Sequence, residues 1–328
     1  MKAIKTLAMA ALATAVFASC SNEDGLPQSN YPMDNVVRIM TSVDGMNTRA
    51  SYGNSTDNLN SFGFCIKNAN SEKYTYDNIK VSQKGYNWIP ATQMLWQNST
   101  TAVDILAYAP YQETTEDANG KVKVFGKTDY AFSVKEDQSN AEDYSSDLIV
   151  FKQTGFTPVS ELNTSKAVEV AFTHLLSQLN LIIELRDQFN TNNNTVTKGF
   201  VTDVKVNGTI ISSKVDFSAS PISVQVDGTQ TAAITPETTG FTPAENATAH
   251  AVFNYSAIVI PQTVAAGNFS ISFKVNNTEY IWTATDAVTF ESGKKHELHL
   301  LAGKDVVQGG AISAKPWGKE TITEKETD

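Results

Sequence analysis

Apolar residues recur at every second position in many short runs of this chain, and this spacing constrains its fold more than any other feature. Successive side chains of a β-strand point to opposite faces, so alternation is typical of half-buried strands. The clearest alternating sets are Val37, Ile39, Thr41 and Val43; Val103, Ile105, Ala107 and Ala109; Val168, Val170 and Phe172; Leu179, Leu181, Ile183 and Leu185; and Phe269, Ile271, Phe273 and Val275. No long amphipathic helix separates these runs, so the sequence predicts an all-β chain of antiparallel β-sandwiches.

Two asparagine pairs predict hairpin turns between strands. Asn207-Gly208 lies between two apolar runs and is the strong signal, because this dipeptide suits the tight turn of a hairpin. Asn276-Asn277 is a weaker signal of the same kind. Residues 219–249 are rich in Thr, Ala, Pro and Gly, and they predict a long loop or excursion inside a second domain.

The first 19 residues have the pattern of a cleaved secretory signal. Lys2 and Lys5 precede the small and apolar stretch 6–18, which is too short to span a bilayer stably. Cys20 follows directly and resembles the cysteine of a bacterial lipobox, with Phe17 at the position that Leu usually holds. This pattern predicts a lipidated Cys20 that anchors the protein in the outer membrane. The alternative is an ordinary signal peptide with an incidental cysteine.

The remaining chain is long enough for two hydrophobic cores. Without residues 1–19, 309 of the 328 residues remain. Residues 20–35 are rich in Gly, Pro, Ser and Asn and predict a flexible tether. Residues 152–166 interrupt the alternation with polar residues, Gly and Pro. We therefore expect two domains, at 36–158 and 159–328.

Charge and cysteine content narrow the functional classes. The formal net charge is −10, and removal of the two signal lysines makes it −12. Such an acidic chain is a poor partner for nucleic acid. With Cys20 lipidated, Cys65 is the only thiol, so the mature chain can form no internal disulfide. Cys65 lies in an apolar run, which predicts a small buried hydrophobe and not a nucleophile.

The sequence offers no convincing catalytic or metal-binding set. His296 and His299 would point to opposite faces of a strand, so they do not form a metal site. No nucleophile elbow, phosphate-binding glycine loop or EF-hand pattern is present. We therefore expect a protein without catalytic residues, metal or cofactor.

Aromatic residues in the first domain suggest an alternative function. Trp88 and Trp96 could stack on sugar rings, as the two indoles of a glycan-binding surface lipoprotein. Large aromatic residues in β-sandwiches more often pack in the core. Both interpretations remain open at this point.

Several segments, in order along the chain, resemble the fimbrillin family, the pilin-type lipoproteins of type V fimbriae. The resembling segments are Asn47-Thr48-Arg49-Ala50, Leu59-Asn60-Ser61-Phe62-Gly63-Phe64, Val103-Asp104-Ile105-Leu106-Ala107-Tyr108-Ala109-Pro110, Phe172-Thr173-His174-Leu175-Leu176-Ser177-Gln178-Leu179, Ala257-Ile258-Val259-Ile260-Pro261-Gln262, Gly293-Lys294-Lys295 and Ile312-Ser313-Ala314-Lys315-Pro316-Trp317. The fourth of these is the most specific, and the whole set, in this order, is more specific than any one segment.

The resemblance implies two tandem transthyretin-like sandwiches and a maturation step. An Arg-specific protease would cut between Arg49 and Ala50, releasing the lipid and the first strand, 36–43. The groove that had buried Val37, Ile39 and Val43 would then accept a strand from another fimbrillin subunit. The implied partners are therefore other subunits, the protease, the outer membrane and surface receptors of host or bacterial cells.

The C-terminal segment bears on the position of the subunit in a fibre. Residues 318–328 contain one large apolar residue, Ile322, and Pro316 lacks the amide that a central ladder needs. Ile312 and Trp317 are expected to complete the sheet of the second domain. This favours a tip or accessory subunit over a repeating stalk subunit.

Overall fold

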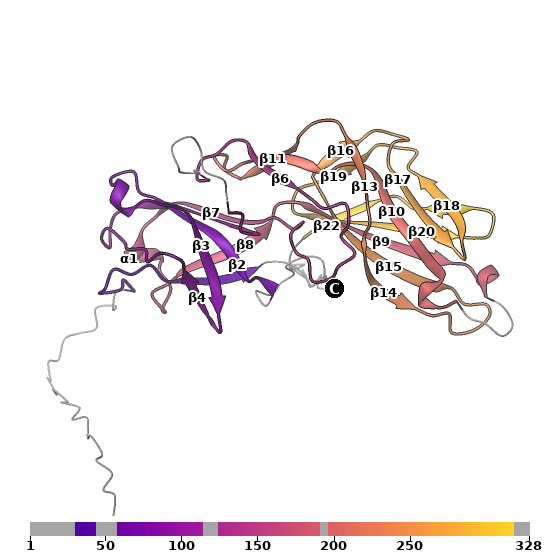
Figure 1. The fold of residues 1–328 in the computed structure, drawn as a ribbon, viewed down its shortest axis with the longest axis horizontal. Coiled ribbons are helices and arrows are strands. Elements are labelled where there is room, and N and C mark those ends of the chain that lie inside the picture. The colour runs from indigo at the N-terminus through magenta and orange to yellow at the C-terminus, as the bar shows by residue number, and fades with distance from the viewer. Residues whose placement is uncertain (1–29, 44–57, 114–123, 191–195, 318–328) are drawn as a thin grey trace, which may run out of the picture.

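The computed structural model describes residues 30–43, 58–113, 124–190 and 196–317, and these residues form two β-rich lobes side by side (Figure 1). The all-β prediction is confirmed, because within the described residues the one α-helix is the single turn α1, Pro158–Glu161, and the other helical pieces are short 3₁₀ turns. Cys20, Arg49, Ala50, the signal segment and residues 318–328 lie outside the described residues, as does the side chain of Val43.

The first lobe is built on one seven-stranded sheet, in the order β1-β8-β7-β5-β2-β3-β4. Its strands are β1 (Ile39–Val43), β2 (Ser61–Lys67), β3 (Tyr76–Lys84), β4 (Asn87–Pro90), β5 (Val103–Ala109), β7 (Ile149–Phe156) and β8 (Val168–His174). Six neighbouring pairs make up this sheet. Five are antiparallel, and the pair of β1 with β8 is parallel.

The second lobe packs a six-stranded sheet, β14-β15-β9-β20-β21, with β22 also on β20, against a four-stranded sheet, β13-β10-β17-β18. Two smaller sheets, β12-β11-β6 and β16-β19, complete it. The strands are β6 (Tyr130–Ser133), β9 (Ser177–Leu185), β10 (Val201–Ile210), β11 (Ser212–Asp216), β12 (Ser223–Val226), β13 (Thr231–Ile234), β14 (Glu237–Thr242), β15 (Ala251–Val259), β16 (Gln262–Val264), β17 (Ser270–Val275), β18 (Thr278–Thr283), β19 (Val288–Phe290), β20 (Lys294–Ala302), β21 (Val307–Gly309) and β22 (Ser313–Pro316).

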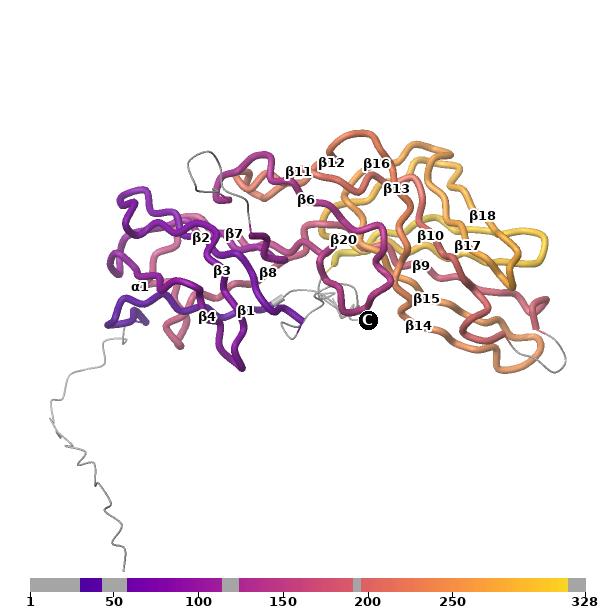
Figure 2. The backbone as a smooth tube through the Cα atoms, in the orientation of Figure 1, coloured from indigo at the N-terminus to yellow at the C-terminus, as the bar shows by residue number. Residues whose placement is uncertain are grey.

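Each lobe contains a strand that comes from the other side of the expected domain boundary at residues 158 and 159. β8 follows that boundary in sequence, yet it pairs with β7 in the first sheet. β6 precedes the boundary, yet it pairs with β11, and its residues belong to the core of the second lobe. Figure 2 shows β6 and β11 running side by side between the lobes. The division at residues 158 and 159 stays a prediction, and the first sheet continues beyond it to His174.

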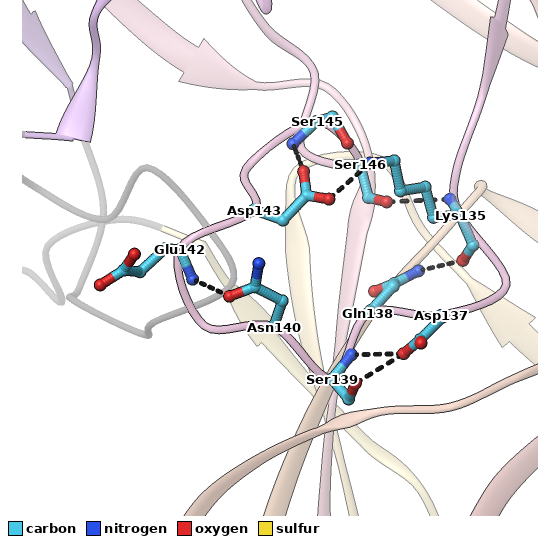
Figure 3. A network of polar contacts seen from close by, with 9 residues as sticks. All are labelled: Lys135, Asp137, Gln138, Ser139, Asn140, Glu142, Asp143, Ser145 and Ser146. Atoms are coloured by element: carbon cyan, nitrogen blue, oxygen red, sulfur yellow. Dashed lines mark hydrogen bonds and ion pairs between the residues drawn. The ribbon is translucent and has the colours of Figure 1, made fainter.

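Polar side chains fasten the loop between β6 and β7 to the second lobe. Gln138 is buried, and its side-chain amide donates to the carbonyl of Ile258 at 2.9 Å and accepts from the amide of that residue at 2.7 Å. Within the loop, Asp137, Asn140 and Asp143 accept hydrogen bonds from amides two residues further on (Figure 3). These are short turn contacts that fix the path of the loop.

A lysine of the first sheet also holds the second lobe. The ammonium of Lys152, in β7, donates to the carbonyls of Phe217, Ser218 and Ala219 at 2.8, 2.9 and 2.8 Å. Partial burial lowers the pKa of Lys152 from its usual value. An ammonium has three N–H donors, and the three carbonyls accept one hydrogen bond from each of them.

The two turn predictions had opposite outcomes. Asn276 and Asn277 connect β17 to β18 with φ of 48° and 66°, so this hairpin is confirmed. The hairpin at Asn207-Gly208 is wrong, because both residues lie inside the continuous strand β10, where the register with β13 shifts. Gly208 has φ of 92° and lies against the backbone of Asn268, so the glycine serves a bulge and a close approach. The predicted loop at 219–249 is also wrong in part, since it contains β12, β13 and β14.

We predict that Gly208→Ala destabilises the fold more than Gly228→Ala does. Both glycines have positive φ, but a Cβ at residue 208 would lie 2.0 Å from the carbonyl oxygen of Asn268, whereas residue 228 has nothing within 4 Å. The difference in the free energy of unfolding should be at least about 2 kcal/mol, measured by urea denaturation. Equal losses would contradict the bulge as the reason for this glycine.

Candidate strand-exchange site

The N-terminal strand β1 lies at the edge of the first sheet. Its residues from Ile39 to Val43 run parallel to Val168–Phe172 of β8, paired one to one. The side chains of Val37 and Ile39 are 2% and 6% exposed, whereas that of Met40, the next residue of β1, is 47% exposed. The expected alternation of the first strand is therefore present at Val37 and Ile39.

The buried face of β1 belongs to the core of the first lobe. Val37 and Ile39 share one cluster with the apolar residues of β8 and with Phe62 of β2. Phe62 meets Phe172 and Trp88 edge to face, with ring centroids 5.3 and 5.1 Å apart. Removal of β1 would therefore expose the apolar side chains of β8 that it now covers.

Hydrogen bonds hold the start of β1 on both sides. On one side, the amide of Val168 donates to the carbonyl of Arg38 at 2.8 Å. On the other, the amide of Val37 donates to the carbonyl of Met94 at 3.0 Å, beside an isolated bridge between Val36 and Leu95. The hydroxyl of Thr41 is buried without a hydrogen-bond partner, so this side chain does not add a hydrogen bond to the ladder that pairs β1 with β8.

An exposed ion pair precedes the strand. Arg38 and Asp34 lie 2.6 Å apart, and the guanidinium of Arg38 lowers the pKa of Asp34 to about 2. Both side chains are about half exposed, so this pair adds little to the hold on β1.

The predicted processing site follows β1 in the chain. β1 ends at Val43, and the structure describes the chain again from residue 58, so Arg49 and Ala50 belong to the interval between. The chain has two other arginines, Arg38 and Arg186. Both have hydrogen-bonded backbones, because the carbonyl of Arg38 accepts from Val168 and the amide of Arg186 donates to Ala302. Paired backbone of this kind resists a protease, which needs an extended accessible segment.

The two tryptophans of the glycan alternative lie in different environments. Trp96 is 2% exposed and stacks on Phe156 with ring centroids 5.7 Å apart, so it has no free ring face for a sugar, contrary to that alternative. Trp88, in β4, is half-buried and borders a groove beside β1. The structure does not bring the two indoles together into one sugar platform, because Trp96 belongs to the core.

The histidines and Cys65 lack the geometry of reactive groups. His296 is buried and its Nε2 accepts from the amide of Glu291, whereas His299 is exposed beside Glu184, so the two do point to opposite faces. Burial lowers the pKa of His296 and raises that of the fully buried Cys65 thiol well above its usual range. Among the described residues, no three His, Cys, Asp or Glu side chains are arranged to hold a metal ion.

Trp317, which follows the last described strand, contacts the same β8 that holds β1, and sequence reasoning missed this contact. β22 pairs with β20, so the expectation that this segment completes the second sheet is met by the described residues. Trp317 is 5% exposed, and its ring stacks on His174, the last residue of β8, at 3.9 Å between centroids. His174 Nδ1 lies 3.0 Å from Asp147 Oδ1, and both side chains are fully buried. Two segments of the family resemblance, 172–179 and 312–317, thus meet in space.

Comparisons with known proteins agree on one family and one fold. The family model described as fimbrillin-like matches residues 48–317. None of the curated proteins matches the chain. Within the described residues, no helix has the length and apolar character to cross a membrane.

Solved structures from Bacteroides share the fold. A candidate cell adhesion protein from Bacteroides uniformis is 19% identical, with 87% of this chain and 99% of that chain covered and a TM-score of 0.58. One from Bacteroides ovatus is 14% identical, with 87% and 98% covered and a TM-score of 0.60. A fimbrial protein from Bacteroides vulgatus is 17% identical, with 86% and 99% covered and a TM-score of 0.51.

We predict that Ile39→Ala loosens β1 and that Met40→Ala does not. Ile39 is buried against the core, and its truncation should lower the free energy of unfolding by about 2–4 kcal/mol. Met40 is its neighbour and half exposed, so its truncation should lower it by less than about 1 kcal/mol. Urea denaturation gives both values, and limited proteolysis tests whether β1 itself opens first. Similar losses in both variants would show that β1 is not seated as described.

Proposed function

The chain belongs to the fimbrillin-like family, and from this premise we propose that it is a structural, tip or accessory subunit of cell-surface fimbriae that acts in adhesion. It is exported as a precursor lipidated at Cys20 and reaches the outer surface of the outer membrane. Its partners are other fimbrillin subunits and receptors on other cells. No catalytic role and no cofactor is part of this proposal.

The observation that carries the proposal is the position of β1. It is an edge strand that pairs with β8 alone among the described strands, and it precedes Arg49 by only a few residues. A cut between Arg49 and Ala50 separates β1 from β2 without breaking any strand that the structure describes. After such a cut, only non-covalent contacts keep β1 in place.

Those contacts are strong enough to hold β1 and weak enough to be exchanged. Each fully buried apolar side chain contributes roughly 1.5–3 kcal/mol, and Val37 and Ile39 are both buried. Before cleavage, the covalent link gives β1 a high effective concentration at β8, which a second chain cannot match. Cleavage removes that advantage, so a strand with the same alternation from another subunit can compete.

The geometry of β8 defines what the incoming strand must look like. It has to run parallel to β8 and place apolar residues two apart, where Val37 and Ile39 now lie. A one-residue slip would turn these side chains to solvent, so the register is selected by burial. β22 of this chain is an unsuitable donor, because its residues are exposed and it is engaged with β20. This supports the tip or accessory position.

We predict that an Arg-specific protease shortens the mature protein to begin at Ala50, and that Arg49→Ala prevents both this cut and incorporation into fimbriae. N-terminal sequencing of the protein purified from the cell surface checks the cut. Arg186→Ala is the matched control and should leave the cut unchanged, because the backbone of Arg186 is paired with Ala302.

A mature surface protein that retains Cys20 and its lipid would contradict the proposal. The chain would then be a membrane-anchored subunit or the glycan-binding lipoprotein of the alternative. A glycan array decides between these, since Trp88→Ala removes the half-buried indole that such a binder would use.

A further inference from the structure

A cavity of about 650 Å³ lies at one edge of the second lobe, between its two main sheets. Residues 282–289, from the end of β18 to β19, form one part of its lining. Residues 309–312 and Ala314, from β21 to β22, form another. β18 is an edge strand of the four-stranded sheet, and β21 is an edge strand of the six-stranded sheet. A concave space of this size suits a small organic ligand.

The indole of Trp282 is the large flat group of this cavity, and the fold fixes its position. Trp282 lies opposite the buried Ile271 in the β17–β18 hairpin, so both side chains are on the inner face of the sheet. Phe269 meets the indole edge to face, with ring centroids 6.3 Å apart. A Cβ at residue 309 would lie 2.2 Å from Nε1 of Trp282, so Gly309 lets the indole lie directly against β21. The indole is half-buried, so part of its surface remains open to the cavity that it lines.

Small residues keep the cavity open. Apart from Trp282, Val288 and Ile312, its apolar lining consists of alanine and glycine. Residue 310 shows the clearance, because a Cβ built there would meet no atom within 4 Å. A ligand therefore binds without rearranging the side chains, which would otherwise weaken its affinity.

The charges of the lining disfavour an anionic ligand. Its charged side chains are Asp286 and Glu291, and the described residues that line the cavity include no lysine or arginine. Glu291 is paired with Lys294 at 2.8 Å, and this contact lowers the pKa of the Glu291 carboxyl. Asp286 has no ion pair among the described residues, and its one hydrogen bond there comes from the hydroxyl of Thr285 at 3.4 Å. Both carboxylates therefore keep positions at which they accept hydrogen bonds from a ligand.

His296 supplies a hydrogen-bond donor to the same cavity. Its side chain is buried and belongs to the lining. Its Nε2 accepts from the amide of Glu291 at 3.0 Å, and burial lowers its pKa, so the ring is neutral and carries its proton on Nδ1. The described residues offer this Nδ1–H no acceptor, and Nδ1 is not among the fully enclosed atoms that lack a partner. The donor is therefore open to a ligand oxygen.

We propose that this cavity binds a neutral sugar residue of a glycan. A sugar ring has an apolar C–H face, which packs on the indole of Trp282, and hydroxyl groups around its rim. These hydroxyls donate to the carboxylates of Asp286 and Glu291, and one sugar oxygen accepts from His296 Nδ1.

Other classes of small ligand match the lining less well. An entirely apolar ligand would leave the carboxylates and the His296 donor unpaired. An anionic sugar would meet two carboxylates without a basic side chain among the described lining residues. A cationic amine would suit Asp286, but it would face the N–H of His296, and Glu291 is already neutralised by Lys294.

The cavity is separate from the strand-exchange site. Its residues belong to the second lobe, and none of them is part of β1, β8 or the segment with Arg49. The inference goes beyond the proposed function, because sugar binding requires neither cleavage nor assembly. Its failure would therefore leave the proposed function untouched. It also differs from the glycan alternative of Trp88, which lies in the first lobe.

Saturation-transfer difference NMR on the full-length chain, in a detergent without a sugar headgroup, tests the proposal. The probes are the methyl glycosides of glucose, galactose, mannose, fucose and N-acetylglucosamine, and N-acetylneuraminic acid is the anionic control. We expect transfer to at least one neutral glycoside, strongest at the protons of one ring face, and at least about tenfold weaker binding of the acid. Absence of transfer to all the neutral glycosides, or tighter binding of the acid, would overturn the proposal.

Two tryptophan variants assign the binding to one lobe. Trp282→Ala removes the indole of the cavity and should weaken binding at least about tenfold. Trp88→Ala removes an indole of the first lobe and should leave binding unchanged. Binding that Trp88→Ala abolishes and Trp282→Ala retains would overturn the proposal in favour of the alternative in the first lobe.

A second pair of variants keeps the test valid if Trp282→Ala impairs folding. Asp286 is exposed, so Asp286→Ala should leave the melting temperature unchanged while it weakens sugar binding several-fold. Asp305→Ala is the matched control, because it removes an exposed acid outside the lining and should leave binding unchanged. Equal affinities in these two variants would overturn the proposal.

Discussion

The parallel pairing of β1 with β8 is the interaction on which the rest of this structure depends. β1 comes at the start of the described chain and β8 more than a hundred residues later, so their contact closes the first lobe around its core. Long-range parallel pairing carries a large loop-closure entropy, which burial has to offset. Val37 and Ile39 supply that burial on one strand, and Val168, Val170 and Phe172 supply it on the other.

β8 also connects the two lobes. Its residues 168–172 hold β1, and its last residue, His174, holds Trp317 by stacking. The first described strand and Trp317, the residue that follows the last described strand, are therefore both in contact with β8. A shift in the position of β8 would therefore displace both β1 and Trp317, because packed interiors transmit displacements between neighbouring side chains.

The sequence predicted strand content well, because period-two burial is a local property of each strand. It predicted Val37, Ile39 and the opposite faces of His296 and His299 for the same reason. Sequence-based prediction failed where the role of a residue depends on a contact with a segment far away in the chain. Gly208 has the turn signal of a hairpin, but the nearby backbone of Asn268, sixty residues later, makes it a bulge. The sequence also could not predict that β1 pairs with β8. Alternation shows that a strand is half-buried, but it does not show which strand lies beside it.

The backbone contacts of the N-terminal segment explain how it is held and how it could be released. The carbonyl of Arg38 accepts from the amide of Val168 beside β8, and the amide of Val37 donates to the carbonyl of Met94 on the opposite side. From Ile39 to Val43 the strand pairs with β8 alone among the described strands. A cut after Arg49 would leave these non-covalent contacts and remove the covalent link that gives β1 a high effective concentration at β8. Exchange would then depend on how well an incoming strand buries apolar side chains where Val37 and Ile39 now lie.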